Sequence, residues 1–207
     1  MADNEEQKPV RKTWTMIKKA PPSITNYTEN PWGDATWEIY EQYVTGSDSH
    51  CNIKCESSIG TWHMEVVASS NSKSKKDARQ IFDGSNGDSF YVDSPTGASS
   101  TYMDLIIIPP KGSYINISSM TVLGKYAQGA YYIDTYVCDK NNMETKIAST
   151  YIGTSNKTNT RVSYNKQINT NTDIYASKIK LHFYMTGDYW GNFYVNELKI
   201  NNCTIKR

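Results

Sequence analysis

The chain has no long apolar segment and no apolar start. None of its 207 residues belongs to a run that approaches the ~18 apolar residues of a membrane-spanning helix. The first residues, MADNEEQKPVRK, begin with acidic side chains and lack the apolar core of a secretory signal. We therefore predict no membrane span, no signal peptide and a protein that is assembled in a cytoplasm.

An excess of charge of one sign is also missing. Lys and Arg total 22 and Asp and Glu total 21, which gives a net charge of +1. A protein that binds nucleic acid needs clustered positive charge to neutralise phosphates. We therefore expect no nucleic-acid partner.

Cysteine is scarce, and its spacing indicates neither disulfides nor zinc. The residues Cys51, Cys55, Cys138 and Cys203 occur in a chain without an export signal, so we predict free thiols. Histidines flank the first two cysteines, but the C-x3-C spacing with an irregular histidine matches structural zinc sites poorly.

Recognisable catalytic motifs are absent. The sequence contains no G-x-S-x-G elbow, H-E-x-x-H pair, P-loop or dinucleotide fingerprint. Its 3 histidines have no partners at a known catalytic spacing. We predict that the protein is not an enzyme.

Aromatic residues and turn formers are abundant and predict an all-β fold. The 16 tyrosines fit pleated strands, and segments with strand character recur at the intervals expected of a sandwich. In KIKLHFYM, apolar and polar side chains alternate from Lys178 to Met185, which predicts a strand covered on one face. Eight segments have this strand character: WHMEVVA, TYMDLIIIP, YINISSMTVLG, YYIDTYVCD, IASTYIG, TRVSYN, KIKLHFYM and NFYVNELKI.

The first part of the chain has a different character. Prolines in KKAPPS at 18–23 and NPW at 30–32 interrupt regular structure and favour extended backbone. We predict an N-terminal extended arm with extra β segments over residues 1–59, for docking or anchoring, and a β domain over residues 60–207. Thr-Trp segments begin at Thr13, Thr36 and Thr61. They are either repeats or three strands that each bury a tryptophan, and we favour the second interpretation.

Five segments of the β domain, in their order and spacing, resemble the discoidin family. This family comprises galactose-binding-like jelly rolls related to coagulation-factor type C domains and to bacterial carbohydrate-binding modules. The resemblance covers residues 60–207 and implies an antiparallel jelly-roll β-sandwich. The segments that carry it are EVVASSNS at 65–72, ARQIFDGSNGDSFYVDS at 78–94, YMDLIIIP at 102–109, ISSMTVLG at 117–124 and FYVNELKI at 193–200.

The chain departs from the family pattern within the segment at 102–109. Ile106 replaces the glycine that usually follows Asp-Leu. The resulting run LIII predicts a strand buried on both faces.

The resemblance also implies a structural calcium ion. The candidate ligands are Asp83, Asp88 and Glu197, together with backbone carbonyls near Ile81 and Ser89. Calcium binds 6–8 oxygen ligands, and a glycine-rich turn allows several carbonyls to converge on it. The alternative is that the two aspartates only accept hydrogen bonds from their own turns.

By the same resemblance, ligands bind in loops at one end of the sandwich. A sugar site needs an aromatic ring and planar polar groups, and two loops supply them. Trp190 either stacks on sugar or caps the sandwich. The candidate ligand-binding residues are Tyr126, Gln128, Tyr131, Tyr132, Asp188, Tyr189, Trp190 and Asn192.

These features together predict a binding protein. A short arm joined to one jelly roll, in a composition rich in Lys, Asn, Ile and Tyr, is similar to a bacteriophage virion protein. We expect a capsid or tail decoration protein present in many copies or as a homo-oligomer, which binds host-surface polysaccharide or neighbouring virion proteins. The alternative is a bacterial carbohydrate-binding module unrelated to a virus.

Overall fold

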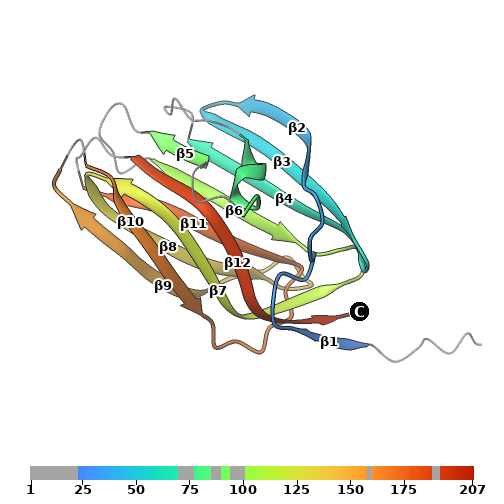
Figure 1. Ribbon diagram of the computed structural model, residues 1–207. Helices are drawn as coiled ribbons and strands as arrows, with labels where there is room; N and C mark the ends of the chain where they lie inside the picture. The colour runs from blue at the N-terminus through green and yellow to red at the C-terminus, as the bar shows by residue number, and fades with distance from the viewer. Residues whose placement is uncertain (1–22, 70–76, 85–89, 94–100, 158–159, 188–191) are drawn as a thin grey trace, which may run out of the picture.

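The structure is a computed structural model that describes residues 23–69, 77–84, 90–93, 101–157, 160–187 and 192–207. These residues form two antiparallel β-sheets that pack face to face (Figure 1). One turn of 3₁₀ helix, η1 (Ala78–Ile81), is the only helix in these ranges. No helix in the described part of the chain has the length and apolar character of a membrane span. The predicted antiparallel jelly-roll β-sandwich is confirmed.

The larger sheet has seven strands, and every neighbouring pair is antiparallel. The strands in spatial order are β2 (Glu38–Thr45), β3 (Asp48–Ser57), β4 (Gly60–Ser69), β6 (Tyr102–Ile108), β11 (Lys178–Thr186), β8 (Gly129–Cys138) and β9 (Glu144–Ser155).

The smaller sheet has five strands built around two long ones. Its path runs from β1 (Ile24–Tyr27) through β12 (Asn192–Lys206) and β7 (Tyr114–Ala127) to β10 (Val162–Asn169). The short β5 (Phe90–Asp93) pairs with the beginning of β12, and β1 pairs with its end.

Alternating side chains create the core between the sheets. In β11, Ile179, Leu181 and Phe183 are at most 1% exposed, whereas the residues between them are partly exposed. The prediction for this strand is confirmed, and strands form at all eight predicted segments. A sheet covered on one face needs this period of two.

The prediction that LIII is buried on both faces is wrong. Leu105 and Ile107 in β6 are fully buried, but Ile106 and Ile108 are partly exposed. The second sheet covers only the inner face of β6, so the outer isoleucines remain at the surface of the larger sheet.

Residues before the predicted boundary at 59/60 belong to the same two sheets. β1 pairs with the end of β12, with Ile24 opposite Lys206. β3 pairs with β4 along its whole length. The sheets therefore show no boundary at residue 59, and residues 1–22 of the predicted arm lie outside the described ranges.

Three buried tryptophans join this N-terminal part to the core. Trp32, Trp37 and Trp62 are 4%, 5% and 0% exposed, and the Trp32 ring lies 5.4 Å from each of the other two, edge-on to both. The prediction of buried tryptophans is confirmed for Trp37 and Trp62, and Trp14 lies outside the described residues.

The cysteines are free thiols, as predicted. Cys51 and Cys55 are buried on the inner side of β3, while His50 lies on its outer side. Because successive side chains of a strand point to opposite faces, these groups do not converge. No cluster of three metal-ligating side chains occurs in the described ranges.

Candidate ligand-binding cleft and cation site

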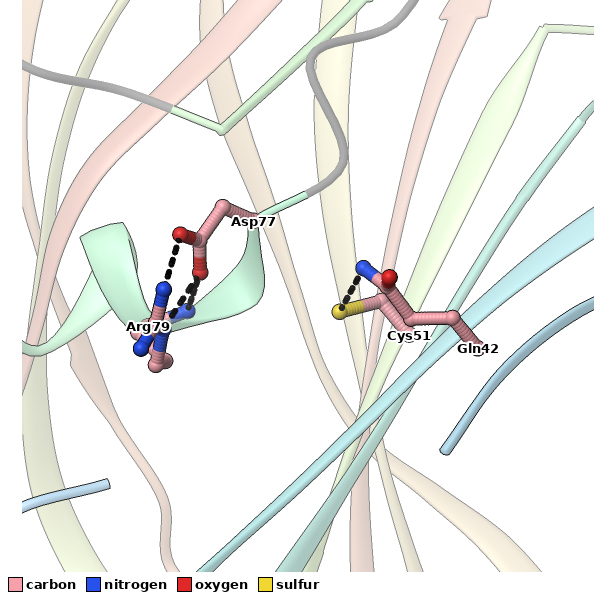
Figure 2. Close-up of polar contacts among 4 residues, drawn as sticks. All are labelled: Gln42, Cys51, Asp77 and Arg79. Atoms are coloured by element: carbon pink, nitrogen blue, oxygen red, sulfur yellow. Dashed lines mark hydrogen bonds and ion pairs between the residues drawn. The ribbon is translucent and has the colours of Figure 1, made fainter. Parts of the chain in front are cut away.

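The segment from Asp77 to Gly84, which we call the Asp-Gly corner after Asp83 and Gly84, is held by a capped turn. Asp77 accepts a hydrogen bond from the backbone N–H of Arg79 at 3.1 Å and forms a two-pronged ion pair with its guanidinium, at 2.9 and 2.8 Å (Figure 2). Ala78 and Ile81 are fully buried and anchor η1 to the core. Gly84 follows with φ of +71°, a conformation that glycine adopts at little cost. The conformation of the corner is thus fixed by the Asp77 cap at its start and by the buried Ala78 and Ile81.

This corner contacts the last strand. The backbone N–H of Gly84 donates a hydrogen bond to the carboxylate of Glu197, which is 4% exposed. Burial raises the pKa of Glu197 above its usual 4.5, and the charge of Asp83 adds to this, while Lys199 and the Gly84 N–H oppose it. Asp83 and Glu197, which the resemblance implies as ligands of one ion, therefore lie near each other.

The Glu197 carboxylate fits a cation ligand. Its Oε2 atom is buried and has no hydrogen-bond partner in the described part of the chain. Calcium binds 6–8 oxygen ligands at roughly 2.3–2.6 Å. The described residues supply two of these ligands, the carboxylates of Asp83 and Glu197, and the second has a buried oxygen without a partner. Asp88 and Ser89 lie outside the described residues.

A cleft adjoins this corner. Its cavity of about 500 Å³ lies within the roughly 300–1,000 Å³ range of small-molecule sites. A smaller cavity of about 380 Å³ shares Asp34 with it, and another of about 260 Å³ shares Thr36. Cavities therefore continue along the N-terminal segment. The cleft is lined by Asp34, Ala35, Thr36, Trp37, Asp77, Arg79, Gln80, Phe82 and Asp83.

One wall of the cleft is aromatic. The Trp37 ring stacks on Phe82 with ring centroids 4.8 Å apart, and Trp32 meets Phe82 edge-on at 5.5 Å. These contacts connect the segment before β2 to the segment after η1. The wall exists only because the N-terminal part of the chain packs onto the Asp-Gly corner.

Two residues of the cleft wall have buried polar atoms that are unsatisfied. Nε1 of Trp37 and Oε1 of Gln80 are buried and have no hydrogen-bond partner among the described residues. An unsatisfied buried donor or acceptor costs about 1–3 kcal/mol. The cleft also contains three carboxylates and one guanidinium. It therefore combines an apolar ring surface with donors and acceptors.

Two of the predicted ligand contacts, Gln128 and Asn192, lie near each other at one end of the sandwich. Gln128 forms the β7–β8 turn with φ of +26°, and Asn192 pairs with the preceding Ala127. The side-chain oxygens of Gln128 and Asn192 are buried without a partner in the described ranges. Asp188, Tyr189 and Trp190 lie outside those ranges.

The tyrosines predicted as ligand contacts lie elsewhere. Tyr131 is 1% exposed, and its hydroxyl donates to the carbonyls of Ala127 and Gln128. Tyr126 is 6% exposed and packs on it. These two predictions are corrected: both rings point inward and close the turn. Tyr132 lies on the outer face of the larger sheet, where it stacks on Tyr184.

The sequence did not point to the cleft. Its walls come from segments at 34–37 and 77–83, which are far apart in the chain. The prolines of this region led to the prediction of an arm. The available signal was NPWGDATW at 30–37, with two tryptophans around a Gly-Asp turn.

Comparison with known proteins yields a faint likeness to carbohydrate-binding modules. No family model and no curated protein matches the chain. Among solved structures, CpGH89CBM32-5 from Clostridium perfringens, in complex with GalNAc-β-1,3-galactose, is 17% identical with a TM-score of 0.41, over 68% of this chain and 94% of that one. CBM32-1 from a family 31 glycoside hydrolase of Clostridium perfringens is 14% identical with a TM-score of 0.44, over 66% and 92%.

A third structure covers more of the chain. The C-terminal domain of a chitobiase from Bacteroides fragilis is 14% identical with a TM-score of 0.41, over 86% of this chain and 97% of that one. Because these TM-scores lie below 0.5, the fold described above rests on this chain's own sheets, and no ligand or residue role is taken from these proteins.

Proposed function

We propose that this protein binds carbohydrate in the cleft beside the Asp-Gly corner, without changing it chemically. The observation that carries the proposal is the combination, in one cavity of ligand size, of the partly exposed Phe82 ring, backed by the buried Trp37, with planar polar side chains. A pyranose has an apolar face that packs on aromatic rings and hydroxyls that both donate and accept hydrogen bonds.

The charges of the cleft favour an uncharged ligand. Asp34, Asp77 and Asp83 outnumber Arg79, so a sulfated or carboxylated sugar meets repulsion. The hydroxyls of a neutral sugar suit carboxylate acceptors and the guanidinium donor.

Binding without catalysis is the simpler use of these carboxylates. Glycoside cleavage needs one carboxyl group held protonated to act as the acid. Asp77 is engaged by the guanidinium of Arg79 at 2.8 and 2.9 Å, and such an ion pair stabilises the carboxylate form.

We also propose that calcium stabilises the corner. Asp83, Asp88 and Glu197 would hold the ion, with carbonyls near Ile81 and Ser89. Asp83 also lines the cleft, so a bound cation would fix one wall of the sugar site. It would also compensate the buried charge of Glu197.

The loop end is proposed as a second contact area for the same ligand class. Gln128 and Asn192 contribute amide groups there, and Asp188, Tyr189 and Trp190 shortly precede Asn192 in the sequence. The amide oxygens of Gln128 and Asn192, which have no partner among the described residues, support this placement.

The proposed setting is a virion surface, where many copies strengthen weak sugar binding. The protein would be assembled in the host cytoplasm and attached through residues 1–22. A bacterial carbohydrate-binding module is the alternative setting. Capsid, portal or tail genes beside this gene would support the first, and a polysaccharide-utilisation cluster would support the second.

The sugar proposal is tested by screening immobilised neutral glycans and measuring the affinity for the best oligosaccharide by calorimetry. Asp34→Ala and Arg79→Ala remove exposed cleft side chains, and each should weaken binding by about tenfold, since a hydrogen bond to a charged group contributes roughly 1.5–3 kcal/mol. Asp173→Ala, an exposed carboxylate far along the chain, is the control. Unchanged affinity in both cleft variants, or no glycan bound at all, would disprove the proposal.

A further inference from the structure

A row of four tyrosines crosses the outer face of the larger sheet. Strand register places Tyr184 of β11 directly opposite Tyr102 of β6 and Tyr132 of β8, and Tyr132 opposite Tyr151 of β9. We call these four residues the tyrosine row. With strands about 4.8 Å apart, it presents one ring per strand over roughly 14 Å.

Three rings of the row contact one another directly, and the fourth, Tyr102, is linked to them through His182. Tyr132 and Tyr184 stack with centroids 5.4 Å apart at 17°, and Tyr151 lies 5.3 Å from Tyr132 at 49°. At such separations the rings are offset, not fully overlapped. His182 continues the row, at 5.2 Å from Tyr184 and 5.8 Å from Tyr102.

The charged side chains nearest to this row are paired with one another. Asp104 bonds to Nδ1 of His182 at 2.6 Å, and Asp134 accepts hydrogen bonds from Lys146 at 2.7 Å and Ser149 at 2.6 Å. Asp48, which accepts a hydrogen bond from Tyr102, adds a further carboxylate, so the charge beside the rings is negative. An anionic polymer is therefore repelled there, whereas a neutral, hydroxyl-rich one is compatible with this surface.

Sheet stabilisation accounts for only part of the row. Cross-strand aromatic pairs stabilise a sheet by themselves, and this suffices for the partly buried Tyr132 and Tyr184. Tyr151 is 50% exposed on the edge strand β9. An aromatic ring so exposed at the end of a continuous row provides a surface for a ligand.

We propose that the tyrosine row binds an uncharged polysaccharide chain lying across the strands. The occupant is a polymer because the row extends over four strands, and it is uncharged because an anionic chain would be repelled by the carboxylates of Asp48 and Asp104 beside the row. The ligand class, carbohydrate, is that of the proposed function, and the inference rests on that proposal for it. The surface itself is separate, because it lies on the outer face of the sheet and none of its residues lines the cleft.

The test is affinity electrophoresis of the full-length protein in gels containing galactan, mannan or a neutral β-glucan. One of these polymers should retard the wild type, and Tyr151→Ala should weaken the affinity for that polymer by about five- to tenfold. Tyr151→Phe, which keeps the ring, should retain most of the binding. Tyr40→Ala is the matched control, because Tyr40 is 45% exposed on β2 of the same sheet but lies outside the row.

The outcomes separate this inference from the cleft proposal. Tyr151→Ala should leave calorimetric affinity for a short oligosaccharide unchanged, whereas Asp34→Ala should reduce it. The inference would be overturned if Tyr151→Ala were retarded as strongly as the wild type, or if Tyr40→Ala lost as much retention as Tyr151→Ala. A dimer that Tyr151→Ala disrupts while polymer retention persists would also overturn it, in favour of a contact between copies of this chain.

Discussion

Glu197 is the residue at which folding and the proposed cation are linked. Its carboxylate is buried against the Asp-Gly corner, and burial raises its pKa. In the absence of a cation, a raised pKa means that folding favours the protonated form. The stability contributed by this group is complete below pH 4.5 and decreases as pH rises through the folded pKa.

Glu197→Gln should therefore change stability in opposite directions with and without calcium. In EDTA at pH 7 we expect the variant to gain roughly 1 kcal/mol in free energy of unfolding, because the buried charge is removed. Added calcium should stabilise the wild type and not the variant. The measurement is urea unfolding from pH 4.5 to 7.5, with Glu65→Gln on the partly exposed side of β4 as control. Equal pH dependence in Glu197→Gln and the wild type would contradict this assignment.

At the scale of elements, the smaller sheet depends on one close crossing. Tyr164 of β10 reaches over Gly124 of β7, and its hydroxyl donates to the carbonyl of Tyr194 in β12 at 2.8 Å. Burial raises the pKa of Tyr164, so the hydroxyl stays protonated and remains a donor. The absence of a side chain at Gly124 allows one bond to tie three strands together.

Gly124→Ala should break this crossing. An added Cβ would overlap the carbonyl oxygen of Tyr194 and the phenol oxygen of Tyr164. Because two of the three neighbouring atoms belong to a rigid ring and one to the backbone, we expect a loss of about 3 kcal/mol in free energy of unfolding. Chemical denaturation measures it, with the adjacent Lys125→Ala as control. A loss below about 1 kcal/mol would show that the sheet relaxes around the new methyl group.

At the scale of the whole molecule, residues 23–59 are part of the sandwich. β1 lies beside the end of β12, and Trp32 packs on Trp62 in the core. Of the segment 1–59, predicted as an arm with extra β segments, residues 1–22 lie outside the described ranges, and we propose these residues for attachment to another structure.

Removal of residues 1–22 should leave stability unchanged and abolish attachment. The truncated protein keeps every described strand, so it should unfold in a single transition, with a free energy within about 0.5 kcal/mol of the full chain. In a virus that carries this gene, purified particles should contain the full-length protein and lack the truncated one, as measured by mass spectrometry. Equal incorporation of both would remove the basis for an anchoring arm.

The sequence by itself determined the all-β class and eight strand positions, and the resemblance to discoidin domains implied that Asp83 and Glu197 lie together. Alternation and turn residues are local, so they identify a strand such as β11 without knowledge of its neighbours. The burial and alignment of individual side chains depend on the register between strands that are distant in sequence. In this register Tyr126 and Tyr131 are buried and Ile106 is partly exposed. The same register aligns one tyrosine from each of four strands in a row: Tyr102, Tyr184, Tyr132 and Tyr151.

The cleft likewise depended on tertiary structure. Its walls join residues 34–37 to residues 77–83, and no periodicity connects segments so far apart. Their contact arises because Trp32, Trp37 and Phe82 bury their rings together, which is favourable only once β2 and η1 have been brought side by side.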